Sequence, residues 1–359
     1  MQPLASIKDL ADIFRHVLEG HTREAIRVVA VFTRQTASHI AQGVNMKLIS
    51  GSAHPTLAKE VAEVTGVPLT DVTISAFPDG ETLVQINENI RGEDVFIIQP
   101  TSPPTNHNLM ELLITVDAAR RASARSITAV IPFFGYARQD RKDKSRMPIT
   151  AKLVANLIQA AGIDRVITLD LHAAQIQGFF DIPVDHLSAE PTLVHYIWDQ
   201  LNGDTSNLTL VAPDVGAVKL AKRYAQSLNS EFAIVAKHRV SATKVEAMNV
   251  IGDVEGRDVL IIDDMTETAG TLCAAAKILK DSGAAKISAG VSHAVIGEMG
   301  HRRILESEID QVLTTNSTPV QETEKVKPLS IAPFLGEAIL RISQAKSVSS
   351  LFDINLTVG

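Results

Sequence analysis

Short apolar, β-branched runs alternate with amphipathic stretches of helical period through most of the chain. The apolar runs are 95–99, 127–131, 166–169, 208–211, 233–235, 259–262 and 287–291. The helical stretches that lie between several of them are 108–122, 150–161, 215–227 and 271–282. Near-continuous apolar strands are typical of sheets buried on both faces, so the alternation predicts an α/β fold with mainly parallel sheets and helices on both faces.

The chain of 359 residues is long enough for two such sheets, because a domain takes roughly 150 residues. A break rich in Pro, Gly, Asp and Ser at 189–207 predicts the junction of two α/β halves of similar size. We therefore expect a first domain at 46–188 and a second at 189–359. Residues 1–45 carry no catalytic pattern. They are either a native N-terminal extension, or biosynthesis starts at Met46.

Composition excludes several classes of protein. The formal net charge of −7 and the pI of about 5.9 argue against a nucleic-acid-binding surface. The single cysteine, Cys273, rules out an intramolecular disulfide and a cysteine-cluster zinc site, and it fits the reducing cytoplasm. The longest apolar run, 127–137, contains Pro132 and Gly135 and is far shorter than the ~20 residues that span a bilayer. We expect neither a nucleic acid nor a membrane as partner.

The strongest chemical signal is the segment VLIIDDMTETAGT at 259–271. An apolar strand ends in Asp263 and Asp264, and a loop of small residues then opens a helix. Ligands of open α/β sheets bind at the carboxyl ends of strands, where loop N–H groups and a helix N-terminus favour a phosphate. The paired carboxylates suit the vicinal hydroxyls of a ribose. The alternative is a strand whose acidic end only caps the helix.

This segment resembles the ribose-phosphate-binding loop of type I phosphoribosyltransferase-fold proteins. Three further segments narrow the match, in order: FPDGET at 77–82, YARQDRKDKSR at 136–146 and DLHA at 170–173. Together they resemble ribose-phosphate pyrophosphokinases of the phosphate-activated class I type, from Met46 to about Phe352. The resemblance implies two phosphoribosyltransferase-like domains with the active site between them and the final segment, about 347–352, packed back on the first.

The resemblance also implies a reaction. The diphosphoryl group of ATP passes to the anomeric hydroxyl of ribose 5-phosphate, by attack at the β-phosphorus, and gives phosphoribosyl pyrophosphate and AMP for nucleotide biosynthesis. The implied cofactor is Mg²⁺, the implied activator is inorganic phosphate, and the implied assembly is a homo-hexamer built from dimers. Catalysis of this kind rests on positioning and charge neutralisation.

Substrate-binding residues follow from the matched motifs. Those implied for ATP are Phe77, Asp79, Glu81, Arg138, Gln139 and Asp143. Those implied for ribose 5-phosphate are Asp263, Asp264, Glu267, Thr268, Ala269, Gly270 and Thr271. Those implied for a regulatory phosphate or ADP are Arg91, Ser145 and Arg146. Without the resemblance, FPDGET would be an ordinary polar turn, and the charged stretch would be either a solvated loop or a flap over a polyphosphate.

Metal and transition-state residues are likewise implied. His172 and Asp214 match metal-ligating positions, although Mg²⁺ prefers oxygen and a lone histidine is usually structural. Lys237 and Arg239 stand at alternate positions of an extended segment, so both side chains point the same way. The resemblance makes them stabilisers of the transition state. Without it, they could equally begin a solvated loop.

Three positions depart from the family pattern. Glu267 stands where the family usually has Asp, Ala217 where it usually has Gly, and Asn89 where it usually has Ser. The first two bear on catalytic efficiency and the third on allosteric control.

Two other functions stay open from the sequence. A phosphoribosyltransferase that consumes phosphoribosyl pyrophosphate would explain only 263–271. A non-catalytic regulatory paralogue would be expected to carry disrupted catalytic stretches, and Lys237, Arg239 and His172 are present.

Overall fold

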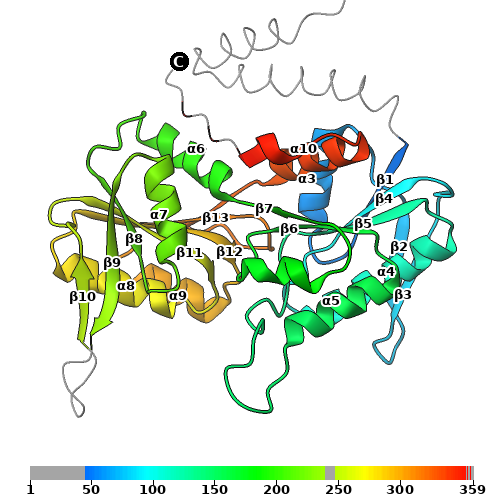
Figure 1. Ribbon diagram of the computed structural model, residues 1–359, viewed down its shortest axis with the longest axis horizontal. Coiled ribbons are helices and arrows are strands. Elements are labelled where there is room, and N and C mark those ends of the chain that lie inside the picture. Colours follow the sequence, from blue (N-terminus) through cyan, green and yellow to red (C-terminus); the bar gives the residue numbers. More distant parts are fainter. Residues whose placement is uncertain (1–44, 239–246, 353, 355, 357–359) are drawn as a thin grey trace, which may run out of the picture.

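The computed structural model describes residues 45–238, 247–352, 354 and 356. Within those residues the strands form a five-stranded sheet, a seven-stranded sheet and a two-stranded hairpin (Figure 1). The parallel sheets with helices on both faces confirm the predicted fold class. None of the helices in the described ranges combines the length and the apolar composition that crossing a bilayer requires.

The first sheet is wholly parallel, in the order β1-β4-β5-β6-β7. Its strands are β1 (Met46–Ser50), β4 (Asp94–Ile98), β5 (Ser126–Ile131), β6 (Arg165–Leu169) and β7 (Val184–Leu187). The helices of this half are α3 (Pro55–Thr65), α4 (Thr105–Arg121), α5 (Thr150–Ala161) and the 3₁₀ turn η1 (Ala174–Phe179). The antiparallel hairpin consists of β2 (Val72–Ala76) and β3 (Thr82–Ile86).

The second sheet has the order β10-β9-β8-β11-β12-β13-β14, and only the β10–β9 pair is antiparallel. Its strands are β8 (Leu208–Ala212), β9 (Glu231–His238), β10 (Ala247–Ile251), β11 (Asp258–Thr266), β12 (Lys286–Ala294), β13 (Gln311–Thr315) and β14 (Val326–Leu329). The helices are α6 (Glu190–Gln200), α7 (Val218–Ser227), α8 (Gly270–Asp281), α9 (Glu298–Glu306), α10 (Ala332–Ser343) and the 3₁₀ turn η2 (Ser349–Phe352).

One apolar core runs across the same face of both sheets, and we call it the shared core. Phe96 and Ile167 enter it from the first sheet, and Leu210 and Leu260 enter it from the second. Helices α3, α6, α7 and α10 cover it, while α4 and α5 cover the other face of the first sheet and α8 and α9 that of the second. Figure 1 shows α3 and α10 above the sheets and α5, α8 and α9 below them. The two sheets are therefore fixed relative to one another by burial of apolar surface.

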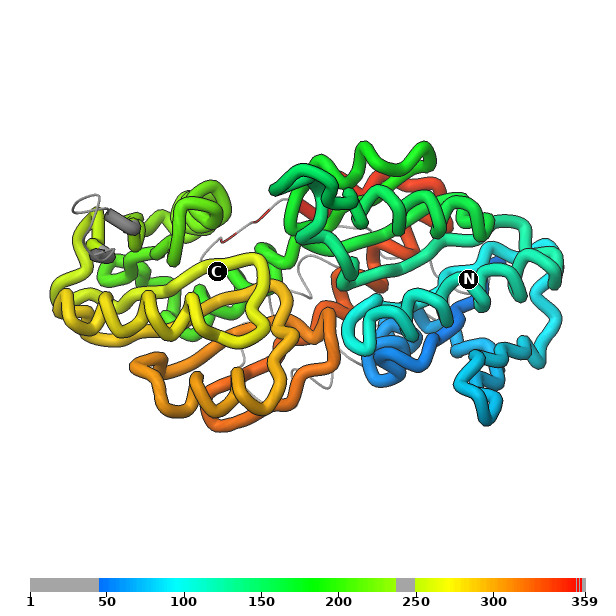
Figure 2. The backbone as a smooth tube through the Cα atoms, turned by 90° about the horizontal axis from the view of Figure 1, so that it is seen from below, coloured from blue at the N-terminus to red at the C-terminus, as the bar shows by residue number. Residues whose placement is uncertain are grey.

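Helix α10 follows the second sheet in the chain but packs against α3 of the first half. Figure 2 shows this red helix on the side of the molecule that holds the blue and cyan segments. Close approach is possible because α10 presents Gly336 to α3. A Cβ at that position would lie 2.6 Å from Cγ1 of Val64.

Two expected features differ in the structure. The segment 189–207 is no open break, because it begins with α6, and Pro191 is tolerated in the first turn of that helix. Strand β11 continues through Asp263 and Asp264 to Thr266, since β12 pairs with it as far as Ala294. The division at 188 and 189 stays a prediction, and residues 1–44 of the expected extension lie outside the described residues.

We expect Gly336→Ala to lower the free energy of unfolding by about 1–3 kcal/mol, because the added methyl forces α10 away from α3. Val64→Ala removes the methyl groups that the new Cβ meets, so the double variant should lose less than the sum of the two single variants. Urea unfolding of all four proteins measures this coupling. Strictly additive losses would show that the two helices do not pack in this way.

Candidate active site

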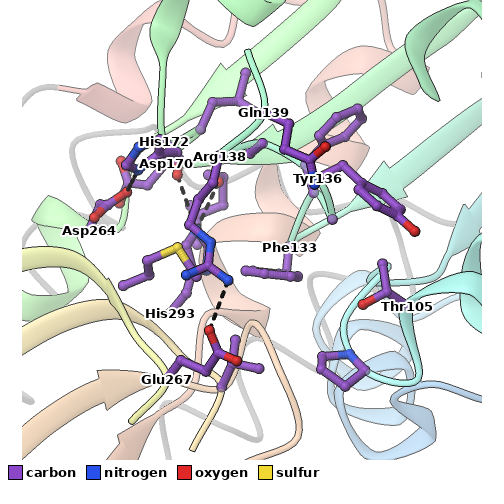
Figure 3. A pocket seen from close by; sticks show the side chains of 18 of the residues that line it. Thr105, Phe133, Tyr136, Arg138, Gln139, Asp170, His172, Asp264, Glu267 and His293 are labelled. Atoms are coloured by element: carbon purple, nitrogen blue, oxygen red, sulfur yellow. Dashed lines mark hydrogen bonds and ion pairs between the residues drawn. The ribbon is translucent and has the colours of Figure 1, made fainter. Parts of the chain in front are cut away.

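A cavity of about 560 Å³ lies where the carboxyl ends of the two sheets meet (Figure 3). The first half contributes loops that follow β4, β5 and β6, and the second half contributes β11, β12 and the residues just after them. Its polar and aromatic lining includes Phe133, Tyr136, Arg138, Gln139, Asp170, His172, Asp264, Glu267 and His293. Four of the predicted substrate residues, Arg138, Gln139, Asp264 and Glu267, and one predicted metal ligand, His172, are thus brought together.

His172 and Asp264 form a hydrogen bond between the two halves. The distance from Nδ1 of His172 to Oδ2 of Asp264 is 2.6 Å. This bond raises the pKa of His172 above its usual value. Burial opposes ionisation of Asp264, but the hydrogen bond and the charge of His172 outweigh it and lower the pKa of that carboxyl. Nδ1 therefore carries a proton, and when the ring gives up its second proton the Nε2 lone pair becomes available as a ligand.

Asp263 lies beside this pair and is held differently. Its burial and the charge of Asp264, with a smaller contribution from Asp214, raise the pKa of Asp263 to about 8. Its Oδ1 accepts a hydrogen bond of 2.9 Å from the backbone N–H of Asp264. A partly buried carboxyl that neighbouring charges perturb in this way, next to a residue that lines a cavity, is typical of a site that binds a cation or a polar ligand.

The side chains that the structure describes do not by themselves enclose a metal ion. Among the described residues there is no group of three or more His, Cys, Asp and Glu side chains suited to hold a metal ion. Asp214 does not line the cavity, and its Oδ1 accepts a hydrogen bond of 3.2 Å from the N–H of Ala217. Mg²⁺ commonly takes only one or two protein ligands and completes its shell with water and phosphate oxygens, so His172 and Asp214 are compatible with it as a partial ligand set.

Arg138 and Glu267 form an ion pair across the cavity. Nη2 of Arg138 lies 2.8 Å from Oε2 of Glu267, as the dashed line between them in Figure 3 shows. Both side chains are more than half exposed, so the pair adds little to stability. Its importance is its position, because it joins a residue predicted to bind ATP to one predicted to bind ribose 5-phosphate.

The loop at 268–271 forms the start of α8. Ala269 has a left-handed backbone with φ of 57°, and Arg303 donates a hydrogen bond of 3.1 Å to the carbonyl of Thr268. Within the residues that the structure describes, no side chain caps this helix. Its first N–H groups can therefore bind an anion, as the sequence predicted for 268–271. Ala217, the second departure from the family pattern, has φ of −82° and needs no glycine.

Other predicted residues lie away from this cavity. Phe77, Asp79 and Glu81 are exposed at and beside the turn of the β2–β3 hairpin. The other predicted residues that are exposed and do not line the cavity are Arg91, Asp143, Ser145, Arg146, Asp214, Thr268, Gly270 and Thr271. Lys237 belongs to β9, where its backbone pairs with Met248, and Arg239 lies outside the described residues.

Comparisons with known proteins identify the family of this chain. The chain matches the N-terminal domain of ribose phosphate pyrophosphokinase over residues 46–162 and the phosphoribosyl synthetase-associated domain over 238–353. It is 52% identical to the ribose-phosphate pyrophosphokinase of Helicobacter pylori over 307 residues, which are 85% of this chain and 96% of the relative. It is 50% identical to that of Neisseria meningitidis over 320 residues, which are 88% and 97% of the two chains.

The chain belongs to the ribose-phosphate pyrophosphokinase family. A crystal structure of phosphoribosylpyrophosphate synthetase from Mycobacterium smegmatis is similar at a TM-score of 0.79 and 39% identity. The similarity covers 84% of this chain and 99% of that one. Both halves described above thus belong to one family architecture.

The sequence reasoning missed one buried residue of this site, His293. It follows the apolar run at 287–291 and lies at the carboxyl end of β12, where ligand-binding residues of parallel sheets gather. This position just after a predicted strand was the signal from which sequence reasoning could have found His293.

We expect the unliganded protein to lose stability as the pH rises from about 5 to 8. The pKa of Asp263 is about 8 in the folded chain, against the ordinary aspartate value of 3.8, so the folded state binds more protons in this range. Asp263→Asn should flatten the decline and raise the melting temperature at pH 8 more than at pH 5. Differential scanning calorimetry measures both, with exposed Glu306→Gln as the control. An equal effect at the two pH values would contradict the raised pKa.

Proposed function

We propose that the cavity between the two sheets is where this chain joins ATP to ribose 5-phosphate. Membership of the family gives the reaction: a ribose-phosphate diphosphokinase transfers the diphosphoryl group of ATP and releases phosphoribosyl pyrophosphate and AMP. The observation that carries the location is the contact of Arg138 with Glu267 and of His172 with Asp264, because each pair unites one residue from each sheet.

Arg138 and Gln139 bind the phosphates of ATP in this proposal. A guanidinium presents several N–H donors in a fixed fork that matches phosphate oxygens. Gln139 is oriented from the same half, because its Oε1 accepts a hydrogen bond of 2.5 Å from the hydroxyl of Thr150 at the start of α5. When ATP binds, its phosphates compete with Glu267 for Arg138.

His172 and Asp214 are the proposed ligands of Mg²⁺. The bond from Nδ1 of His172 to Asp264 orients the ring and leaves Nε2 to a metal, an arrangement that carboxylate–histidine pairs commonly adopt. When bound, Mg²⁺ would offset the negative charge of the phosphates and polarise the group that is transferred. The partly buried carboxylates Asp263 and Asp264 favour cations in the same region.

Ribose 5-phosphate is assigned to the segment 263–271. The N-terminus of α8 receives the 5-phosphate, and Asp263, Asp264 and Glu267 lie before it, where sugar hydroxyls would be placed. Lys237 and Arg239 remain the proposed transition-state stabilisers. Lys237 is the last residue but one of β9, and Arg239 follows it at the next alternate position of the sequence.

A neighbouring copy of the chain completes the ATP site in this proposal. Phe77, Asp79 and Glu81 are exposed on the β2–β3 hairpin and do not line their own chain's cavity, so they reach ATP only in another subunit. Helix α5 also exposes Leu153 and Leu157, one turn apart on the same face. Exposed apolar residues of this kind suit subunit contact, and we propose a homo-hexamer built from dimers.

The finer class, compartment and domain division are also proposals. Arg91, Ser145 and Arg146 are exposed and cationic or polar, which suits a regulatory phosphate or ADP and the phosphate-activated class I type. Asn89, which replaces the usual Ser, accepts a hydrogen bond of 3.1 Å from the N–H of Arg91, so this turn keeps its shape. The single cysteine suits the cytoplasm. The proposed boundary between the two domains lies between residues 188 and 189.

Phosphorus NMR tests the reaction and its activation. Purified protein with ATP, ribose 5-phosphate and Mg²⁺ should give phosphoribosyl pyrophosphate and an equal amount of AMP, faster with inorganic phosphate.

Lys237→Ala should lower kcat by about 10²–10³-fold with an unchanged circular dichroism spectrum, as loss of one preorganised charge does in other enzymes. Near-normal turnover in that variant would remove Lys237 from the mechanism, and an equal rate without phosphate would remove the activating site.

Light scattering tests the assembly. The wild-type protein should have the mass of a hexamer, and Leu153→Asp should shift the mass to that of smaller species, because a charge on this face opposes its burial.

A mixture of the Glu81→Ala and Arg138→Ala proteins should recover some activity, because a site formed between the two kinds of subunit can have both residues intact. A stable monomer with full turnover would contradict the shared site.

A further inference from the structure

The carboxyl end of β6, which His172 follows by three residues, is held by two consecutive residues of β12. Nε2 of His293 lies 3.1 Å from the carbonyl oxygens of both Leu169 and Asp170. The hydroxyl of Ser292 donates a hydrogen bond of 2.6 Å to Oδ2 of Asp170. These contacts join the first sheet to the second directly beneath the cavity.

The contacts of the His293 ring show which of its two nitrogens carries the proton. Carbonyl oxygens only accept hydrogen bonds, so Nε2 carries the proton and donates to both of them. Nδ1 lies 2.7 Å from the hydroxyl of Ser317, and the ring packs edge-on to Phe133 with centroids 5.2 Å apart. His293 is 3% exposed, and burial lowers its pKa, which favours the neutral ring.

A β-bulge explains how the side chains of the adjacent residues Ser292 and His293 can both contact Asp170. Side chains normally alternate between the two faces of a strand, but the pairing of β12 with β13 shifts between Val291 and His293. Bulges re-aim side chains and are frequent next to active sites. The carbonyl of Ser292 at the bulge accepts a hydrogen bond of 2.6 Å from the hydroxyl of Thr315, so the bulge is internally satisfied.

The held backbone is strained. Asp170 has φ of 33°, which is unfavourable for a residue with a side chain. Such a conformation persists only when its surroundings over-determine it. Here Oδ2 of Asp170 accepts from Ser292 and from the N–H of Ala189, at 2.9 Å, while His293 binds the carbonyl of Asp170. Two residues later the chain presents His172 to Asp264.

We propose that His293 is a positioning residue for diphosphoryl transfer: it holds the carboxyl end of β6 and thereby sets His172 against Asp264. Figure 3 shows His293 beside Arg138, below His172 and Asp264 in this view. The functional part of this claim rests on the proposed role of His172 as a metal ligand.

The first test reads the geometry without any activity. Two-bond ¹H–¹⁵N spectra of histidine-labelled protein, at a pH where the rings are neutral, report which nitrogen of His172 carries the proton. The wild type should show the Nδ1-protonated tautomer, and His293→Leu should lose it. His293→Gln keeps an N–H donor at the position of Nε2 and should restore it, whereas the shorter His293→Asn should not. If His293→Leu does not fold, the Gln and Asn variants decide.

The second test reads the function. Binding of Mn²⁺ with α,β-methylene-ATP, counted by electron paramagnetic resonance, should weaken by about 10–100-fold in His293→Leu, as loss of an outer-shell partner does. The kcat should fall by a similar factor, while the KM for ribose 5-phosphate stays within about twofold because its loop belongs to α8. His54→Leu, at another buried histidine, should change only the melting temperature.

The outcomes are separable. An unchanged tautomer in His293→Leu, or unchanged Mn²⁺ affinity and kcat with an altered tautomer, would overturn the positioning role. If the wild-type protein makes no AMP, the proposed function fails, and the tautomer experiment still decides whether His293 sets His172.

Discussion

The arrangement of this molecule depends on one apolar core that two mainly parallel sheets share. Leucine, isoleucine and phenylalanine side chains from corresponding faces of both sheets are buried under α3, α6, α7 and α10. This burial fixes the sheets with their carboxyl ends toward one cavity. Because all strands of a parallel sheet end at the same edge, the residues that follow them become neighbours there. The cavity between the two sheets is a consequence of this packing.

The chemistry of the cavity follows from what such an edge can hold. Asp263 and Asp264 are partly buried at the end of β11, and burying two adjacent carboxylates costs free energy unless a partner offsets their charge. His172 supplies one partner, and Asp263 takes up a proton in the unliganded chain. In the proposed function, a bound cation would offset the charge of these carboxylates. Part of the free energy that the unliganded site costs would then be regained on binding.

Sequence reasoning reached the fold because strand and helix periods are local. The predicted helix at 150–161 coincides with α5, and the run at 259–262 lies inside β11. It failed where local signals mislead, as at Pro191, which suggested a break but occupies the first turn of α6. The segment 263–271 was recognisable because strand, carboxylates, loop and helix are contiguous.

Long-range contacts could not be predicted in the same way. His172 and Asp264 are 92 residues apart, and the contact of His293 with the end of β6 joins residues 123 and 124 positions apart. Only the shared core decides that these strand ends meet. The place of Phe77 away from its own cavity is also a tertiary property, since the hairpin turn gives no sign of where it points.

The most direct measurement is a crystal structure with Mn²⁺, α,β-methylene-ATP and ribose 5-phosphate, with the metal located by its anomalous scattering. The account predicts a Mn²⁺ peak on Nε2 of His172 while Nδ1 stays bonded to Asp264, phosphates of the nucleotide on Arg138, and the sugar phosphate at the start of α8. A nucleotide bound outside the cavity, or a metal bound without His172, would contradict it.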